Sequence, residues 1–315
     1  VLLEQNDQRT YIAQSGLIGP DGIDAGGRAQ FSAAQDKFTL QEGQDSLVVD
    51  LQWQGENGVE VTKRLTLHRG QYVIDVEYLV SNNSGQRWQA NLFGQIKRDS
   101  SPAPSTASGG GMGLNPFLGA ATTQPDKHFT KFSFDDMAEE PFKAKLPGGW
   151  IAMIQHNFLS ARVPTPNQSH NYFTRVTPGG YNIAGFTSQA LVLDPGQQGS
   201  TGARFYAGPK DQYSLEEISP YLELSVEYGW LWWIAQPLFW LLNKIYALVG
   251  NWGVAIILLT VLIKAAFFKL SATSYKSMAN MRRVQPKMQD IREQYADDKQ
   301  KQSQAMMDLY KKEKI

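Results

Sequence analysis

The longest nearly uncharged stretch of the chain, residues 230–268, constrains the fold more than any other feature. Lys244 and Lys264 are the only charged residues among its 39 positions. A membrane-spanning helix needs about 20 apolar residues, so the stretch is too long for a single crossing. It predicts a chain that is held at a membrane, with an apolar connector between two polar ends.

Two arrangements of this stretch are open. In the first, residues 229–246 form an amphipathic helix in the membrane interface and residues 247–269 form one transmembrane helix. In the second, both halves cross the membrane as a hairpin that turns at residues 249–251. The first is favoured, because Gln236 and Lys244 make the first half a poor span, whereas a tryptophan-rich, lysine-tipped helix suits the interface. The expected interfacial anchors are Trp230, Trp232, Trp233, Trp240 and Trp252.

The charged residues predict how the chain is oriented. Residues 264–315 hold twelve lysines and arginines against six acidic residues, a net charge of +6, and residues 1–263 carry a net charge of −6. Basic residues concentrate on the cytoplasmic side of membrane helices. The part after the apolar stretch is therefore expected in the cytoplasm, and the part before it outside, which is the periplasm if the source is Gram-negative.

Residues 1–212 are expected to form an all-β sandwich domain. Tyr72, Ile74, Val76, Tyr78 and Val80 would all fall on one face of a strand, which predicts a strand with an apolar face at residues 72–80. Further strands are expected at residues 59–67, where the alternation is imperfect, and at 88–93, 150–155, 171–176 and 188–193. Many short strands separated by Gly, Asn and Pro are typical of a sandwich. A Ser-, Pro- and Gly-rich stretch between Ser100 and Asp126 predicts a surface loop.

Two helical parts flank the apolar stretch. Residues 213–228 are expected to be a helical connector, since residues 212–222 have a helical pattern. Residues 270–315 are expected to form a cytoplasmic helical hairpin that is incomplete at its end. An apolar stripe with spacings of three and four residues predicts its first helix, and a proline within the stripe is expected to kink it. The residues that characterise this helix are Met278, Met281, Arg282, Arg283, Val284, Pro286, Met288, Ile291 and Tyr295.

Lys264 lies in the most lipid-like part of the apolar stretch. A charge at membrane depth is costly, and it is usually paired, turned to a wet cavity or extended to the interface. Lys264 lies five residues before Lys269, about 7.5 Å along a helix, so its side chain can reach the headgroups by snorkelling. The residues alone leave a hydrophilic cavity and snorkelling both open. The residues that would share its face on one helix are Gly253, Thr260, Phe267 and Ser271.

The sequence lacks the patterns of an enzyme or a metal protein. It has no cysteine, which excludes disulfides and thiolate metal sites. Its four histidines are scattered, at positions 68, 128, 156 and 170, and no H-E-x-x-H or G-x-S-x-G motif occurs. We therefore expect a protein that is not an enzyme, uses no metal, nucleotide or other cofactor, and makes no direct readout of nucleic acid.

Eight segments carry a resemblance to a known family. They are residues 228–239 (YGWLWWIAQPLF), 250–253 (GNWG), 277–282 (SMANMR), 285–287 (QPK), 298–300 (DKQ), 304–307 (QAMM), 14–17 (QSGL) and 93–95 (FGQ). They closely resemble the Gram-negative YidC membrane insertases, whose relatives are the mitochondrial Oxa and chloroplast Alb proteins. The resemblance covers the whole chain, which reads as an excerpt truncated at both ends.

The resemblance implies a mixed fold: a β-supersandwich periplasmic domain, an interfacial helix, one transmembrane helix and a cytoplasmic helical hairpin. It implies a membrane insertase and chaperone that helps nascent inner-membrane proteins insert through a hydrophilic groove. In that family a basic residue and a threonine line the groove, and their positions match Lys264 and Thr260. The usual basic residue is arginine, so lysine keeps the charge but loses the bidentate fork. The remaining groove helices would lie beyond Ile315.

The resemblance also implies the partners. They are nascent membrane proteins, the general secretion channel, a ribosome or targeting factor at the cytoplasmic face, and the lipid bilayer. An alternative function is a membrane-tethered carbohydrate-binding or mutarotase-like domain, because supersandwich folds of this type occur in sugar enzymes. That alternative requires carboxylate and histidine side chains that meet in a cleft.

Overall fold

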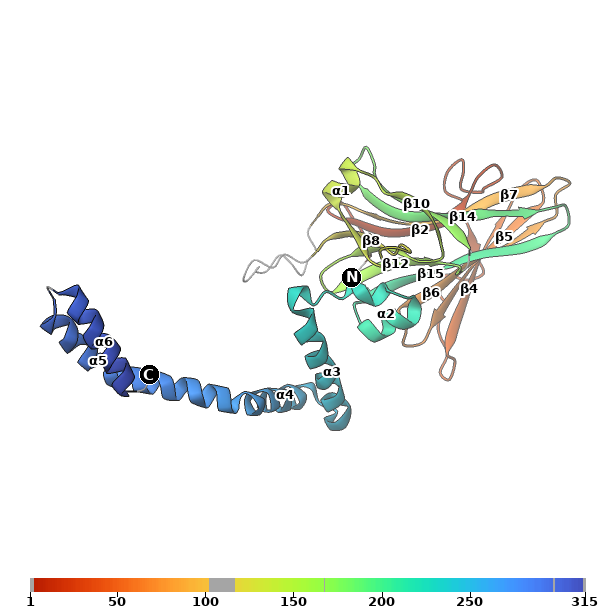
Figure 1. The fold of residues 1–315 in the computed structure, drawn as a ribbon. Helices are drawn as coiled ribbons and strands as arrows, with labels where there is room; N and C mark the ends of the chain where they lie inside the picture. The colour runs from red at the N-terminus through yellow and green to blue at the C-terminus, as the bar shows by residue number, and fades with distance from the viewer. Residues whose placement is uncertain (1–2, 102–116, 167, 297, 314–315) are drawn as a thin grey trace. The chain divides into compact units, whose positions relative to one another are not determined.

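A computed structural model describes residues 3–101, 117–166, 168–296 and 298–313 (Figure 1). The chain divides into two compact units, Val1–Glu227 and Tyr228–Ile315. Most of the surface loop expected between Ser100 and Asp126 lies outside the described residues.

Two antiparallel sheets form the first unit, as the sequence predicts for residues 1–212. The order of the six-stranded sheet is β1 (Glu4–Gln5), β2 (Thr10–Ile18), β7 (Trp88–Arg98), β14 (Asn182–Leu193), β13 (Ser169–Val176) and β10 (Lys143–Pro147). The order of the nine-stranded sheet is β3 (Ser32–Ala33), β4 (Ser46–Gln54), β5 (Val59–His68), β6 (Val73–Asn82), β15 (Gln198–Pro209), β12 (Phe158–Pro164), β11 (Ile151–Ile154), β8 (Gly119–Thr122) and β9 (Thr130–Ser133).

The two sheets pack face to face around an apolar core (Figure 1). Hydrogen bonds also join them. The hydroxyl of Tyr11 on β2 donates to Oγ of Ser160 on β12 at 2.9 Å, and the hydroxyls of Ser15 and Tyr78 lie 3.0 Å apart. The core residues that both sheets contribute include Leu17, Leu92, Ile96, Phe186, Val76, Tyr78, Val80 and Phe205.

Strand β6 follows the alternation that predicted it. Val76, Tyr78 and Val80 are buried, whereas the residues between them are half-buried. A period of two with one buried side is the signature of a strand whose one face covers a core. Tyr72, which the pattern also places on this face, precedes the strand and is exposed.

A β-bulge interrupts the pairing of β14 with β7. The register shifts between Thr187 and Ala190, which places Ser188 and Gln189 opposite Leu92. Oγ of Ser188 accepts a hydrogen bond from the backbone N–H of Leu92 at 3.0 Å. This side chain therefore satisfies a buried backbone donor at the bulge.

The bulge also reverses which residues of β14 point to the core. Ala184 and Phe186, at even positions, belong to the core before it, and Leu191 and Leu193, at odd positions, contact the core after it. An extra residue in a strand shifts the two-residue period by one. The strand expected at residues 188–193 is for this reason only the second half of β14.

Helical segments at the end of the first unit cover the nine-stranded sheet. Helix α2 (Gln212–Ile218) and the 3-10 helix η3 (Leu222–Ser225) bury Leu215, Ile218 and Leu222 against Trp150. Nε1 of Trp150 donates to the carbonyl oxygen of Pro220 at 3.1 Å. The connector expected at residues 213–228 is thus helical in two short pieces. A further helix, α1 (Phe134–Glu139), precedes β10.

The second unit is helical. It comprises the 3-10 helix η4 (Gly229–Leu231), α3 (Trp232–Val249), α4 (Trp252–Ala266), α5 (Phe268–Gln294) and α6 (Lys299–Glu313). Gly250 ends α3 in the left-handed conformation, at φ +65°, where glycine bears no steric penalty. The side chain of Asn251 then caps α4 by accepting from the N–H of Val254 at 3.2 Å.

Candidate functional site

Helix α4 carries the first part of the candidate site. Gly253, Thr260 and Lys264 all lie within it, and all three are exposed. Steps of seven and four residues bring them to nearly the same side of a helix with 3.6 residues per turn. The other exposed positions of α4 are apolar; they include Val254, Ile256, Ile257, Leu258, Val261 and Leu262.

Phe267 and Ser271 do not continue this face on the same helix. Phe267 lies between α4 and α5, at φ −92° and ψ +6°, and Ser271 lies in α5. The two helices are bent by 61° at this break. The N–H of Phe267 still donates to Ile263, and the N–H of Ser271 to Phe267, so helical hydrogen bonds continue across the bend. The arrangement of all five residues on one straight helix is therefore wrong.

The helix expected at residues 247–269 is divided among three helices. Residues 247–249 end α3, residues 252–266 form α4, and residues 268–269 begin α5. The capped break at Gly250 and Asn251 coincides with the turn of the alternative hairpin arrangement. Among the described residues, the length and hydropathy expected of a membrane span are reached by α4 and α5 as a bent pair, and by no helix alone.

The hydroxyl of Thr260 is already bonded within α4. Its Oγ1 donates to the carbonyl oxygen of Ile256 at 2.8 Å. A threonine that bonds the preceding turn satisfies its only donor without a partner from another helix. Thr260 can still accept a hydrogen bond from a second molecule.

The expected interfacial tryptophans lie on α3 and at the start of α4. Trp232, Trp233 and Trp240 are among the most exposed apolar residues of α3. Trp252 stacks on Tyr246 with ring centroids 3.9 Å apart. The side chain of Trp230 is not among those that the structure describes. Indole rings at exposed positions are typical of a membrane interface, where one side of the ring is apolar and the other polar.

The helical hairpin buries only part of the expected apolar stripe. Val284 of α5 is 1 % exposed, and the hydroxyl of Tyr310 on α6 lies 3.8 Å from Sδ of Met288. Met278 and Met281, earlier in the stripe, are exposed. Helix α5 passes through Pro286 as one element. The exposed basic residues near the stripe include Arg282 and Arg283.

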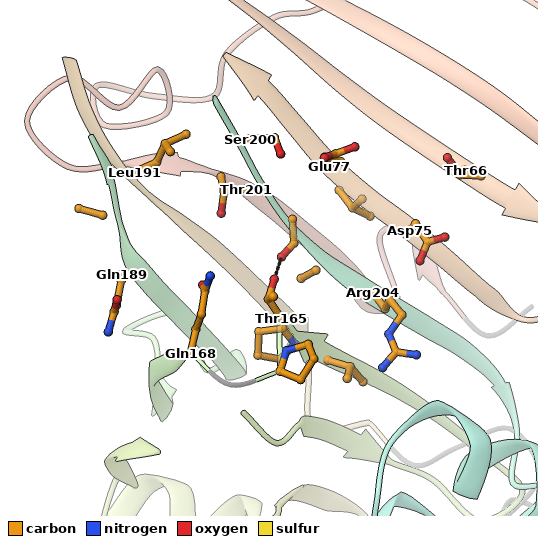
Figure 2. Close-up of a pocket in the computed structure, with 17 residues that line it drawn as sticks. Thr66, Asp75, Glu77, Thr165, Gln168, Gln189, Leu191, Ser200, Thr201 and Arg204 are labelled. Carbon is orange, nitrogen blue, oxygen red and sulfur yellow. Dashed lines mark hydrogen bonds between the residues drawn. The ribbon is translucent and has the colours of Figure 1, made fainter. Parts of the chain in front are cut away.

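A polar cavity of about 660 Å³ lies in the β unit (Figure 2). Asp75 and Glu77 of β6 and Arg204 of β15 supply its charged groups. Two of the three are already engaged, because Asp75 contacts His68 and Nη2 of Arg204 donates to the carbonyl oxygen of Ile218 at 2.6 Å. Figure 2 also shows the hydrogen bond from Thr165 to the carbonyl oxygen of Gly202.

One histidine meets a carboxylate in a cavity. Nε2 of His68 lies 2.7 Å from Oδ2 of Asp75, and both residues line a second cavity of about 450 Å³. By contrast, His128 stacks on Tyr221, and His170 is buried and bonded to a backbone carbonyl. Within the described part of the chain, no three His, Asp or Glu residues are grouped as metal ligands.

The sequence interpretation missed a group of cations that line a cavity between the sheets: Arg162 is buried, Lys63 half-buried and Arg28 exposed. Lys63 and Arg162 line a cavity there together with Arg28. Lys63 occupies the position in β5 that follows the buried Val59 and Val61 in the alternation. A lysine at a position that the alternation turns to the core is the sequence signal that could have revealed this cavity. Arg162 offers no such signal, because both faces of β12 are buried.

Comparison with known protein families accounts for nearly the whole chain. Residues 1–241 match the family described as "YidC periplasmic domain", and residues 244–315 match the family described as "60Kd inner membrane protein".

Curated relatives named "Membrane protein insertase YidC" align with the entire chain. The relative from Stutzerimonas stutzeri is 51 % identical, that from Pseudomonas aeruginosa strain LESB58 is 49 % identical, and that from Cellvibrio japonicus is 48 % identical. In each case the alignment covers 100 % of this chain but only 56 %, 58 % and 57 % of the relative, respectively. The chain thus spans little more than half the length of these relatives.

Two of the solved structures that match part of this chain are only distantly similar. A galactose mutarotase related enzyme from Lactobacillus acidophilus has a TM-score of 0.38 at 12 % identity, over 57 % of this chain and 71 % of its own. The α-galactosidase AgaA from Geobacillus stearothermophilus has a TM-score of 0.42 at 11 % identity, over 67 % and 30 %. These low scores decide nothing about function. The family matches and the close relatives are decisive, and this chain belongs to the YidC family of membrane protein insertases.

Proposed function

We propose that the full-length protein inserts and folds nascent inner-membrane proteins, and that the polar face of α4 is the part of this chain that contacts them. The supporting observation is Lys264, an exposed cation that shares a face with Gly253 and Thr260 on an otherwise apolar helix. A helix that is apolar on most sides and polar on one requires protein or water on that side. Membership of the YidC family supports a client protein as the occupant.

The proposed mechanism is electrostatic and local. Polar and acidic segments of a client cross a membrane at a high free-energy cost. A hydrated, positively charged recess beside α4 lowers this cost and attracts acidic residues of the client. Lys264 provides the positive charge as a single ammonium group, which attracts carboxylates without the bidentate geometry of arginine. Phe267 and Ser271 would contact the client beyond the bend.

The proposed orientation places the β unit in the periplasm and the hairpin of α5 and α6 in the cytoplasm. The excess of basic residues after α4 supports it. The exposed Met278 and Met281, beside Arg282 and Arg283, suit a surface that receives clients from a ribosome or a targeting factor, because methionine side chains adapt to varied partners. The tryptophans of α3 would hold this helix in the interface, and the general secretion channel would act as a partner in part of the reaction.

The experiment replaces Lys264 in the full-length protein. We expect Lys264→Ala and Lys264→Glu to impair insertion of a client with an acidic translocated segment, and Lys264→Arg to retain it. Lys269→Ala, which removes an exposed lysine five residues later, is the matched control. Neutralising the acidic residues of the client should reduce the difference between the variants. Unchanged insertion by both Lys264→Ala and Lys264→Glu would exclude this role.

A second candidate function is favoured by one observation. The contact between His68 and Asp75, both in the cavity of about 450 Å³, meets the requirement of a carbohydrate-binding or mutarotase-like domain. If the cavity binds sugars, the chain will retain glycans on an array, and His68→Ala together with Asp75→Ala will abolish the signal. Absence of glycan binding by the unaltered chain excludes this candidate.

A further inference from the structure

A cavity between the two sheets holds more positive than negative charge. Its volume is about 430 Å³, within the roughly 300–1,000 Å³ of sites for small molecules. Strand β2 contributes one wall, and β5, β6, β12 and β15 of the other sheet contribute the opposite wall. The segment between β2 and β3 supplies Asp24, Arg28 and Phe31.

Arg162 is the deepest cation of this cavity. The residue is 3 % exposed, and its guanidinium lies 4.3 Å from the ring centroid of Phe205. Nη2 donates to the carbonyl oxygen of Gln14 at 3.0 Å, whereas Nε is buried and has no acceptor among the described residues. A buried donor without an acceptor is costly, since it has lost its water and gained nothing in return.

Lys63 is a second cation without a carboxylate partner in the described structure. Its Nζ lies 5.4 Å from the ring centroid of Tyr78 and 5.9 Å from that of Phe31. Burial lowers the pKa of Lys63 from its usual 10.5 to about 8, and repulsion from Arg162 and Arg28 adds to this effect, while Asp24 opposes it. Contacts with aromatic rings stabilise the ammonium group of Lys63 less than a hydrogen-bonded carboxylate or phosphate would.

The single carboxylate of the cavity is already used. Asp24 accepts from the N–H groups of Leu17 at 2.9 Å and Ala29 at 3.1 Å, and it lies 3.6 Å from Nη1 of Arg28. Asp24 pairs with Arg28 and lends Lys63 only part of its attraction, so the described lining of the cavity holds three cations against one carboxylate. An anion is the missing component.

We propose that this cavity binds a small organic anion, with its carboxylate or phosphate group held between Lys63 and Arg162 and its apolar body against the opposite walls. Arginine and lysine form short, charge-assisted hydrogen bonds with both kinds of group. The apolar walls restrict the ligand to a compact body with one charged end. The wall residues are Leu65, Ile74, Phe31 and Phe205. This site is separate from α4, and binding to it does not depend on the proposed insertion activity.

Calorimetric titration of the full chain in a non-ionic detergent tests the site. Benzoate and phenyl phosphate are the anionic probes, and benzamide is the neutral probe of the same size. We expect at least one anion to bind about tenfold or more tightly than benzamide, and the tighter anion identifies the preferred head group. Equal affinities for benzamide and both anions, or no binding of either anion, would overturn the proposal.

Variants assign the effect to the cavity. Lys63→Met removes the charge but keeps an unbranched apolar stem, and it should abolish the preference for anions. Lys97→Met is the matched control, because Lys97 also lies over an aromatic ring, at 3.8 Å from Tyr181, but does not line the cavity. A preference that survives Lys63→Met, or that is lost equally in Lys97→Met, contradicts the assignment.

The pH dependence of binding provides a second measurement. The charged or titratable groups that face Lys63 are Arg162, Arg28, Asp24 and Tyr78. Burial lowers the pKa of Arg162 to about 10 and raises the pKa of Tyr78 to about 12, so neither titrates between pH 7 and pH 9. Loss of the Lys63 proton in this range should weaken anion binding about tenfold. An affinity that is constant from pH 7 to pH 9 would contradict the role of Lys63.

Discussion

The hydroxyl of Tyr11 donates a hydrogen bond to Oγ of Ser160 across the interior of the β unit, at 2.9 Å. The two residues lie on different sheets, are separated by 149 positions in the sequence, and are both fully buried. The ring of Tyr11 also lies 5.1 Å from the guanidinium of Arg98. A polar contact in this position fixes how one sheet sits on the other, because apolar packing alone tolerates small displacements.

We predict that Tyr11→Phe lowers the free energy of unfolding by about 1–2 kcal/mol, since it leaves a buried hydroxyl without its partner. Urea unfolding followed by the β-sheet circular dichroism signal measures the change. The exposed Tyr72, which is 57 % accessible, provides the control Tyr72→Phe, with an effect within about 0.5 kcal/mol. If the double variant Tyr11→Phe with Ser160→Ala loses the full sum of the single effects, the two hydroxyls do not interact.

Lys63→Met should stabilise the β unit at neutral pH. The pKa of Lys63 is lowered from 10.5 to about 8 in the folded chain, mainly by burial, so the protonated side chain opposes folding. The loss of folding free energy caused by the charged lysine has its full size below about pH 8. It disappears as the pH rises to about 10.5, because between these values the unfolded chain binds more protons than the folded chain. The gain at pH 7 should reach at most about 3 kcal/mol.

Unfolding of both proteins at pH 7, 8, 9 and 10, in buffer without carboxylates or phosphate, measures this gain. The difference between Lys63→Met and the unaltered chain should narrow steadily above pH 8. Lys97→Met, at a lysine that does not line the cavity, is the control variant. A gain from Lys63→Met that stays constant over the whole range would mean that the lysine is not the group that titrates.

Thr260→Val should reduce insertion by less than about twofold in the full-length protein. The only donor of Thr260 is used by the carbonyl oxygen of Ile256, so valine removes an acceptor and an intrahelical bond but no free donor. Lys264→Ala is expected to have the larger effect in the same assay. If Thr260→Val is as damaging as Lys264→Ala while Thr260→Ser is normal, the hydroxyl itself contacts the client.

Val284→Asp should separate α6 from α5. The side chain of Val284 is 1 % exposed, and an unpaired carboxylate in that place costs several kcal/mol, on the order expected for a buried charge. Hydrogen exchange of the α6 amides measures the loss of packing. Met281→Asp, at a residue that is 41 % exposed, should leave the exchange rates nearly unchanged. Equal rates in Val284→Asp and the unaltered chain would show that this residue does not hold the hairpin together.

A strand can be recognised in this sequence where one of its faces is buried and the other is not, because its apolar residues then recur at every second position. Strand β6 satisfies this condition, and its pattern is visible. The pattern is absent from β12, where residues on both faces are buried, and it is broken in β14, where the bulge changes its phase. Pairing between β2 and β7 joins residues about 80 positions apart, such as Gln14 and Gln95, and no local signal specifies it.

The candidate site was partly predictable for a related reason. The face of Gly253, Thr260 and Lys264 follows from helical spacing alone. The break at Gly250 and Asn251 is expected only as the turn of the less favoured hairpin arrangement. The bend at Phe267 has neither glycine nor proline at its centre, so nothing in the local residue types marks it. The cavity of Lys63 and Arg162 required the two sheets to be stacked before its cations could be placed together.

The bulge in β14 makes the length of this strand as important as its composition. Deleting one residue at the bulge would restore an unbroken alternation and leave Leu191 and Leu193 on the core side of the sheet. Deleting one residue elsewhere in the second half of the strand, with the bulge kept, would shift the alternation by one and turn side chains to the outer side. Many substitutions within β14 preserve this arrangement, whereas a change of one in the number of residues preserves it only at the bulge, where Ser188 and Gln189 lie opposite Leu92. Among descendants of this sequence, insertions and deletions should therefore be excluded from residues 182–187 and 190–193 and should collect at the bulge and in the turns at either end.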